Sequence, residues 1–307
     1  MHAWQAIQTA VNYIEENLDK PIPLEALAST AALSPYYFQR LFARLVRKPV
    51  QEYCKLRRLS KACDALQHKG IRVLDVALAY GFSSHANFTR AFKAAYGITP
   101  EEYRRRPVIL NQFIKPDLLL HYTPVTEGVP LITDGMVVEV TRRRLHEPCI
   151  ISGLSGELPI SELTGGRTTG VATAGILWDT FHQKKEAIPH LLSGSAKYGV
   201  LHLNGASEGH CIYLAGAKAH APAGGYASFT LPCGEYIVCG FEAANFKELI
   251  GSAVFLAASY MEGWLKKQGI RCGNFAAEVY YDIRPDACYM EQWIPVMQQA
   301  EGAGEIR

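Results

Sequence analysis

The 307-residue sequence lacks the features that mark membrane, exported and metal-binding proteins. No apolar run reaches the roughly 18 to 20 residues that a membrane span requires, and the first residues do not form the basic-then-apolar pattern of a signal peptide. The eight cysteines form no CxxC pair and no Cys/His cluster with zinc spacing. We therefore expect a cytoplasmic protein with reduced, mostly buried thiols, no metal and no membrane partner. Sensing by one free thiol stays open.

Motifs of common catalytic machinery are also missing. There is no HExxH, and Gly153-Leu154-Ser155-Gly156 lacks the spacing of a GxSxG nucleophile elbow. The glycine-rich stretch from Gly165 to Gly170 lacks the lysine of a phosphate-binding loop. The ten histidines show no metal-ligand spacing. We expect no enzyme activity, no catalytic residues and no cofactor.

Net charge is small, but its distribution is uneven. The chain carries a formal charge of +2 in all, yet residues 1–110 hold 16 basic and 9 acidic residues, and residues 111–307 hold 15 and 20. An excess of +7 in the first part favours a polyanionic partner. The alternative is a solvated basic face, and charge alone does not decide between them.

The first part contains an internal repeat with a shift of 50 residues. The matched pairs share the same residue type: Ser34 with Ser84, Phe38 with Phe88, Arg40 with Arg90, Phe42 with Phe92, and Tyr53 with Tyr103. Each serine is placed to cap a helix whose aromatic residues recur at helical spacing. The repeat therefore predicts two helices that each bury one face.

The surrounding pattern predicts a helix-turn-helix unit around each repeated serine. A first helix over residues 3–19 precedes a short helix from Leu24 and the tight turn before Ser34. A connecting helix over residues 50–67, about 27 Å long, separates this unit from a second one with its turn at Gly81. Two such units fit successive major-groove openings, which recur about every 34 Å, so that a monomer can read an asymmetric site.

These residues resemble the AraC/XylS family of bacterial transcription regulators over about the first 106 residues. Residues 22–66 and a longer pattern after them carry the resemblance: Ala77, Gly81, Phe82, Ser84, Phe88, Arg90, Phe92, Lys93, Gly97, Thr99, Pro100, Tyr103 and Arg104. The resemblance implies binding to double-stranded DNA, with RNA polymerase as a further partner.

It also implies positions that read bases early in each second helix: Tyr36, Gln39 and Arg40, then His85, Ala86, Thr89 and Arg90. Arginine can bridge guanine O6 and N7, glutamine can pair with adenine, and alanine or the threonine methyl can touch the thymine methyl. The alternative for both arginines is an internal salt bridge. For phosphate contact we expect basic residues around these helices: Arg44, Arg47, Lys48, Arg57, Lys93 and Arg104.

The second part changes to short β-branched or aromatic runs bounded by Gly and Pro, which predict strands. Eight strands, over residues 136–140, 149–154, 200–203, 211–215, 226–231, 236–241, 275–281 and 289–296, alternate with helices over about 175–185 and 246–268. The order strand-strand-helix-strand-strand occurs twice. The predicted fold is thus multidomain: an all-α double helix-turn-helix domain (1–106), a linker (107–135) and an α+β domain of two pseudosymmetric sheet-and-helix halves (136–298).

The second part resembles the GyrI-like effector-binding domains found behind multidrug-responsive regulators. The resemblance lies in "GILWDTF", Tyr198-Gly199, Tyr213 to Gly216, "LPCGEY", "EVYYD" and "MEQWIP". It implies that Glu291 faces a small-molecule site among aromatic side chains, for which the candidates are Trp178, Tyr198, Tyr213, Phe229, Trp264 and Trp293. Cys233 departs from the small residue usual at its position.

A carboxylate among aromatic rings suits a lipophilic cation. The alternative is a solvated Glu291 and aromatic residues that only form the core. The hypothesis is therefore a DNA-binding transcription regulator with a small amphipathic or cationic effector. Two other classes stay open: a GyrI-like hydrolase with Glu291 as general base, and a module that scavenges small molecules or binds a protein.

Overall fold

The computed structural model describes residues 2–68, 70–120, 123, 126–133, 136–163, 166, 168–281 and 288–297. The chain divides into two compact units. The helical unit comprises Met1–Pro124 with Ser161–Ile176, and the sheet unit comprises Val125–Ile160 with Leu177–Arg307. Segment 161–176 therefore lies between two stretches of the sheet unit in sequence but is part of the helical unit.

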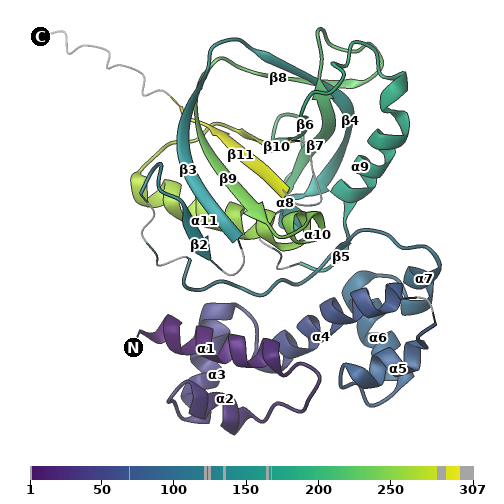
Figure 1. The fold of residues 1–307 in the computed structure, drawn as a ribbon, viewed down its shortest axis with the longest axis vertical. Coiled ribbons are helices and arrows are strands. Elements are labelled where there is room, and N and C mark those ends of the chain that lie inside the picture. Colours follow the sequence, from purple (N-terminus) through teal and green to yellow (C-terminus); the bar gives the residue numbers. More distant parts are fainter. Residues whose placement is uncertain are drawn as a thin grey trace, which may run out of the picture. The chain divides into compact units, whose positions relative to one another are not determined.

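Seven helices form most of the helical unit (Figure 1): α1 (Ala3–Glu16), α2 (Leu24–Thr30), α3 (Pro35–Val46), α4 (Val50–Gln67), α5 (Val73–Ala79), α6 (His85–Tyr96) and α7 (Pro100–Arg105). Helix α4 spans the residues predicted for the connecting helix. Ser34 accepts a hydrogen bond from the Tyr37 backbone N–H, and Ser84 accepts one from the Asn87 N–H. Both predicted serine caps are thus confirmed, and each supplies an acceptor for an otherwise unpaired backbone N–H.

The two helix-turn-helix units differ by one residue in their turns. Helices α2 and α5 are related by a shift of 49 residues, whereas α3 and α6 are related by the shift of 50 seen in sequence. Ala32 and Gly81 occupy equivalent places in the two turns and have φ angles of +53° and +74°. The second turn then contains one additional residue before its serine cap.

Two hydrophobic clusters share α4. Phe38, Phe42 and Tyr53 lie in the first, with residues of α1 and α2, and Phe88 and Phe92 lie in the second. The first half of α4 contributes buried residues to the first cluster, and its second half contributes buried residues to the second. Helix α4 therefore joins the two helix-turn-helix units through buried contacts.

The segment after α7 is extended, as its prolines predicted, and it packs on the helices. Phe113 and Leu118 are buried in the first cluster. Strand β1 (Leu110–Asn111) pairs with β5 (Gly170–Val171), which comes from segment 161–176. This pairing was not visible in the sequence because the two strands have two residues each and are about 60 positions apart.

A nine-stranded antiparallel sheet dominates the other unit. Its strands, in spatial order, are β2 (Leu131–Thr133), β3 (Met136–Leu145), β9 (Gly234–Ala243), β11 (Cys288–Pro295), β10 (Phe275–Tyr280), β6 (Lys197–His202), β7 (His210–Lys218), β4 (Cys149–Pro159) and β8 (Ala227–Leu231). All eight predicted strands are present, and β2 is additional. The helical segments of this unit are α9 (Thr173–Lys184) from Leu177 onward, the 3₁₀ helix η1 (Lys185–Ala187), α10 (Phe246–Glu248), the π-helix η2 (Leu249–Ala253) and α11 (Val254–Gln268). Helix α8 (Ile160–Leu163) lies almost entirely in segment 161–176 of the helical unit.

The two strand-strand-helix-strand-strand halves exchange their first strands. Strand β3 belongs to the first half in sequence but pairs with β9 of the second, and β8 of the second half pairs with β4 of the first. Strands β6 and β10 join the halves into one sheet. This exchange was not predicted, because strand pairing over such sequence separations leaves no local pattern.

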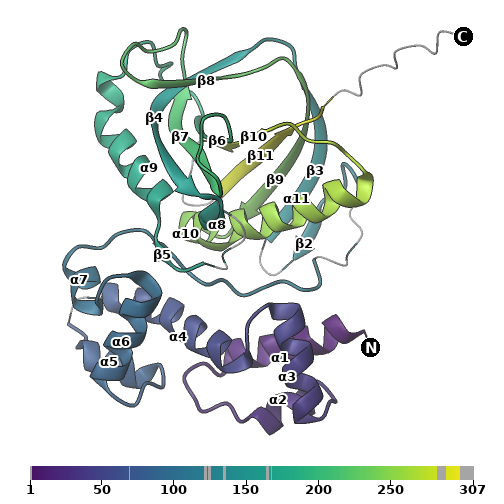
Figure 2. The ribbon, with the colours of Figure 1, turned by 180° about the vertical axis from the view of Figure 1, so that it is seen from behind.

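Helices contact one face of the sheet. Trp178 of α9 donates to Tyr213 of β7, and Gln292 of β11 donates to the Val254 carbonyl of α11. Figure 2 shows α11 across the β9 region and α9 beside β4 and β7. We call this the helix-covered face. Strand alternation places Glu291, Tyr198 and Trp293 on the opposite face, which we call the second face.

Candidate functional sites

The start of α3 presents three exposed polar or aromatic side chains. Tyr36 is 67% exposed, and Gln39 and Arg40 are also exposed. The guanidinium carbon of Arg40 lies 5.7 Å from the centre of the Tyr36 ring, a cation–π distance. All three predicted base-reading residues of α3 therefore lie on its exposed surface, free of the core that Phe38 and Phe42 occupy.

The start of α6 presents His85, Ala86 and Arg90 as exposed side chains. Thr89 differs, because its hydroxyl oxygen is buried and has no hydrogen-bond partner within the described part of the chain. The hydroxyl of Thr89 therefore does not reach a base in this conformation. Among the described residues, neither Arg40 nor Arg90 forms a salt bridge with an acidic side chain, in contrast to the internal pairing considered as their alternative.

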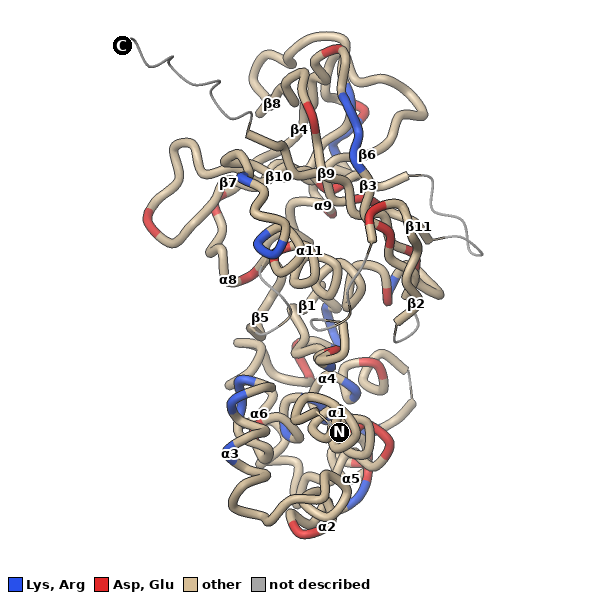
Figure 3. The backbone as a smooth tube through the Cα atoms, turned by 90° about the vertical axis from the view of Figure 1, so that its left-hand side faces the viewer, with Lys and Arg blue, Asp and Glu red and all other residues tan. Residues whose placement is uncertain are grey.

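Four of the predicted phosphate-contacting residues are accessible around these helices. Arg44, Arg47 and Lys93 are exposed, and Lys48 is half-buried. Figure 3 shows basic residues at α3 and α6. These positions can approach the backbone of a duplex that α3 and α6 enter.

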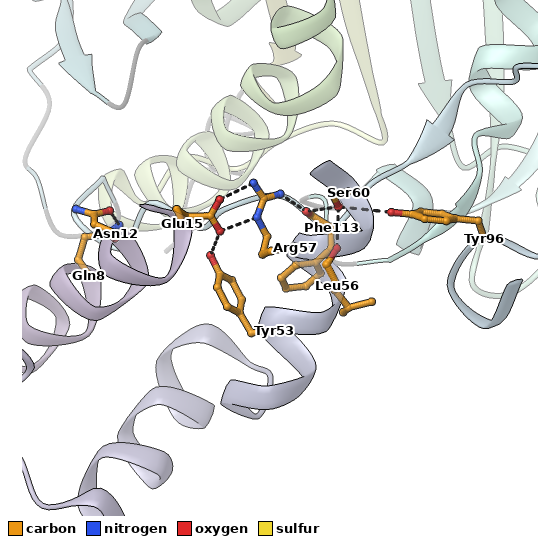
Figure 4. A network of polar contacts seen from close by, with 9 residues as sticks. All are labelled: Gln8, Asn12, Glu15, Tyr53, Leu56, Arg57, Ser60, Tyr96 and Phe113. Atoms are coloured by element: carbon orange, nitrogen blue, oxygen red, sulfur yellow. Dashed lines mark hydrogen bonds and ion pairs between the residues drawn. The ribbon is translucent and has the colours of Figure 1, made fainter. Parts of the chain in front are cut away.

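Arg57 is a correction to the predicted phosphate set. Its Nε and Nη2 donate to the two carboxylate oxygens of Glu15, each at 2.8 Å, and its Nη1 donates to the Phe113 carbonyl (Figure 4). Tyr53 Oη also donates to Glu15, at 2.8 Å. Burial raises the pKa of Glu15, but the Arg57 hydrogen bonds and charge, with the Tyr53 hydroxyl, outweigh it and lower this pKa below its ordinary value. The Arg57 side chain is only 11% exposed, so it ties α1 and the 113 region to α4.

Arg104 is a second correction. Its Nε donates to the Leu66 carbonyl at 3.2 Å, and its Nη2 is buried without a partner among the described residues. The side chain therefore holds α7 against the end of α4. Its guanidinium is turned toward protein and is not presented to a phosphate.

Glu291 is the centre of a buried polar cluster on the second face. Only 1% of the residue is exposed. Arg143 of β3 approaches both carboxylate oxygens, with Nη1 3.1 Å from Oε2 and Nη2 2.6 Å from Oε1. Three neutral donors complete the cluster: Tyr281 Oη at 2.6 Å, Tyr289 Oη at 2.7 Å and Trp293 Nε1 at 2.8 Å. The solvated alternative for Glu291 is therefore wrong.

The neutral donors stay protonated at neutral pH. Burial, with the hydrogen bond and charge of Glu291, raises the pKa of Tyr281 to about 12 and raises that of Tyr289 further. A Cβ atom at Gly240 would lie 2.4 Å from Tyr289 Oη, so glycine at this position leaves the space in which the hydroxyl reaches Glu291. The donors around Glu291 are thus positioned by the packing of neighbouring strands.

Three of the predicted aromatic residues share the second face with Glu291: Tyr198, Phe229 and Trp293. A chain of ring contacts links two of them, since Phe229 contacts Phe275, Phe275 contacts Tyr236, and Tyr236 contacts Trp293, with centroid separations between 5.1 and 6.3 Å. The face therefore combines one carboxylate with a connected aromatic surface.

The other three predicted aromatic residues lie toward the helix-covered face. Tyr213 alternates onto that face, Trp178 donates to its hydroxyl at 3.1 Å, and Trp264 is buried on α11. These residues are not brought together with Glu291. The single-sequence prediction grouped them because aromatic content does not show which way a strand residue points.

A second carboxylate, which is half-buried, accompanies Trp178 and Tyr213. Glu278 Oε2 accepts hydrogen bonds from Tyr213 Oη at 2.7 Å and Tyr280 Oη at 2.8 Å. Burial raises the pKa of Glu278 and outweighs the two hydroxyl donors. A Cβ at Gly199 would lie 2.2 Å from Tyr213 Oη, so this cluster also depends on a glycine for space.

Arg143, Tyr281 and Tyr289 were not predicted as site residues. Arg143 lies in the basic run Arg142-Arg143-Arg144, which reads as a charged strand end. Strand alternation is the signal that could have identified Arg143. It places Arg143 on the same face of β3 as Glu139 and Thr141, and this is the second face of the sheet, on which Glu291 lies.

No helix in the described ranges is both long and apolar enough to cross a membrane. No group of three or more His, Cys, Asp or Glu side chains there is arranged to hold a metal ion.

Two family models match the chain. A helix-turn-helix domain model matches residues 27–106, and a model described as a GyrI-like small molecule binding domain matches residues 148–297. The first covers both repeat units, and the second covers the sheet from β4 to β11 with Glu278 and Glu291.

Known proteins resemble the first part of the chain. The right origin-binding protein of Escherichia coli K12 is 36% identical over 133 residues, which are 41% of this chain and 46% of that protein. The regulatory protein SoxS of Salmonella typhimurium is 32% identical over 102 residues, which are 33% of this chain and 95% of SoxS. The matched region thus spans about half of the first relative and nearly all of the second.

A solved structure resembles the second part. The structure of SAV2435 bound to tetraphenylphosphonium is 15% identical, with a TM-score of 0.40, and the match covers 52% of this chain and 94% of that one.

Proposed function

This chain belongs to the AraC-type family of helix-turn-helix transcription regulators and carries a GyrI-like small-molecule-binding domain, and from this premise we propose that it is a one-component regulator. Helices α3 and α6 read an asymmetric DNA site, and the second face of the sheet binds a small amphipathic or cationic effector around Glu291. RNA polymerase is the further partner through which occupancy of the site changes transcription.

The observation that supports base reading is the exposed start of each recognition helix, beside a buried aromatic face. Tyr36, Gln39 and Arg40 are all accessible on α3. Bidentate contact of an arginine with guanine contributes about 1–3 kcal/mol of discrimination.

The test is affinity against salt concentration for the wild type and Arg40→Ala, on the preferred site and on random DNA. We expect the variant to lose affinity mainly on the preferred site. Arg44→Ala is the matched control, because loss of a phosphate contact weakens both DNAs and lowers the salt slope by about one. Equal loss on both DNAs for Arg40→Ala would remove this residue from base readout.

The observation that carries the effector proposal is a carboxylate that is 1% exposed and lies beside a connected aromatic surface. Rings present negative faces and apolar area, and a carboxylate supplies the opposite charge for a lipophilic cation. Tetraphenylphosphonium and tetraphenylborate make a matched pair of probes, since they share a shape and differ in the sign of charge.

Calorimetric titration of the full chain with both probes tests this proposal. We expect tetraphenylphosphonium to bind and tetraphenylborate to bind weakly or not at all, and we expect Glu291→Gln to weaken cation binding. Equal cation affinity of the wild type and Glu291→Gln would contradict the role of the carboxylate.

Hydrolysis is the less supported function. A general base needs a carboxylate oxygen within reach of a water or substrate proton. Glu291 already accepts hydrogen bonds from three neutral side chains and pairs with Arg143. The relatives are transcription regulators, and a binding role agrees with both the site and the DNA-reading helices.

A further inference from the structure

We infer that Arg143 is an intramolecular competitor of the effector, so that an organic cation binds at Glu291 by replacing the Arg143 guanidinium. This inference rests on the proposed effector site. The guanidinium is bidentate on the Glu291 carboxylate, with nitrogen–oxygen distances of 2.6 and 3.1 Å. Its central carbon also lies 5.7 Å from the centre of the Trp293 ring. A carboxylate and an aromatic face are the two contacts that an aromatic cation would use.

Charge separates Arg143 from the other donors around Glu291, and its exposure separates it from the carboxylate that it contacts. Tyr281, Tyr289 and Trp293 are neutral donors, and the pKa of both tyrosines is raised, so among the described residues Arg143 alone supplies a positive charge to the carboxylate. Its side chain is 43% exposed, whereas that of Glu291 is 1% exposed. The guanidinium is therefore the member of the cluster that can leave toward solvent while the neutral donors remain.

Departure of Arg143 alone would leave a buried carboxylate without a counter-charge, which is strongly unfavourable. Binding of a cation is then an exchange of one positive charge for another. A small hydrated cation offers nothing that the guanidinium lacks. A cation with large apolar groups gains the additional free energy of removing apolar area, its own and that of the aromatic surface, from water. The exchange thus selects lipophilic cations over small ones.

Calorimetric titration of full-length Arg143→Met with tetraphenylphosphonium tests the exchange. We expect the variant to bind the cation more tightly by about tenfold or more, because a charge-assisted contact no longer has to be broken. Arg143→Lys keeps the charge without the two-nitrogen fork, so we expect a smaller gain. In the Glu291→Gln background, Arg143→Met should give no gain, since no carboxylate is left to compete for.

Arg144→Met is the matched control. It removes the same charge from the adjacent residue of β3, but strand alternation points this side chain to the other face. We expect it to leave cation affinity unchanged, which separates local competition from a general change in charge. Thermal unfolding of each variant shows whether it is folded. If Arg143→Met is not folded, the cation affinity of Arg143→Lys relative to that of the wild type tests the competition instead.

If the wild type binds tetraphenylphosphonium and folded Arg143→Met binds it equally or more weakly, competition between Arg143 and the cation is overturned. The proposed effector site at Glu291 would remain. An equal gain in Arg144→Met would also overturn the competition. Absence of cation binding in both the wild type and Arg143→Met would overturn the competition and the cationic effector together.

Discussion

At the scale of single residues, charge alone does not reveal what a basic side chain does. Arg40 is exposed on a recognition helix, whereas Arg57 pairs with Glu15 inside the helical unit. Both stand among residues predicted to contact DNA. The difference arises from the position of α4, whose side chains near residue 57 face α1 and the chain around Phe113.

The Glu15–Arg57 pair makes a stability prediction. Arg57→Met leaves the Glu15 carboxylate without its cation, and we expect the free energy of unfolding to fall by about 3 kcal/mol, as for other buried pairs that lose one partner. Glu15→Leu with Arg57→Met should recover much of this loss, because an apolar pair leaves no charge unpaired. Urea unfolding followed by circular dichroism checks both. Equal stability of Arg57→Met and wild type would show that the pair has no net stabilising effect.

The same pair predicts a pH dependence. The pKa of Glu15 is lowered from its ordinary value of 4.5, so its contribution to stability is complete above about pH 4.5 and is lost as pH falls through the lowered value. We expect the unfolding free energy of the wild type to fall relative to that of the Glu15→Leu, Arg57→Met double variant on acidification below pH 4.5. A pH-independent difference would contradict this assignment.

Glu278 predicts the opposite sign. Its pKa is raised by burial, so the folded protein holds a proton that the unfolded chain releases, and stability falls as pH rises from 4.5 through the raised pKa. Glu278→Gln removes this penalty and keeps an oxygen that accepts from Tyr213 and Tyr280. We expect the variant to be more stable than wild type at pH 7 and similar at pH 4, as measured by thermal unfolding. Lower stability of the variant at pH 7 would show that the carboxylate is needed as an ion.

At the scale of elements, the duplicated helices share a scaffold and differ in what they present. The phenylalanine pairs of α3 and α6 are buried in equivalent positions. At the predicted base-reading positions, α3 carries Tyr36 and Gln39 where α6 carries Ala86 and Thr89. Because the side chains differ while the helices match, the two units are suited to different sequences.

We therefore expect Arg40→Ala and Arg90→Ala to relax specificity in different half-sites. Each should cost about 1–3 kcal/mol at the base pair that the arginine contacts. Binding to a set of operators with single base substitutions checks this, with Lys93→Ala as a control that weakens all of them alike. Loss of specificity at the same base pairs for both arginine variants would contradict separate half-sites.

At the scale of the whole molecule, the chain passes between the two units more than once. It leaves the sheet unit after Ile160, contributes Ser161–Ile176 to the helical unit, and returns at Leu177. Helix α9 runs across this return, with Gly175 packed against Ile109 in the helical unit and Trp178 bonded to Tyr213 in the sheet unit.

This continuity predicts that effector and operator binding are coupled through α9. Saturating tetraphenylphosphonium should change operator affinity by some factor, and operator should change cation affinity by the same factor. Trp178→Phe, which loses the hydrogen bond to Tyr213, should reduce that factor. Trp264→Phe on α11, a helix wholly within the sheet unit, is the control and should preserve it. Titrations of each ligand with and without the other provide the measurement, and equal coupling in both variants would exclude α9 as the connection.

The amino-acid sequence by itself determined the helices, the strands and the duplicated serine caps, because these depend on local spacing and on residue chemistry. The tertiary structure alone decided which of them meet. The exchange of β3 and β8 between the halves brings Arg143 to Glu291 across 148 positions of sequence. Strand alternation then divides the predicted aromatic residues between two faces, and burial turns Arg57 from a candidate DNA contact into a structural ion pair. These outcomes depend on long-range pairing and register, which no local pattern of residues specifies.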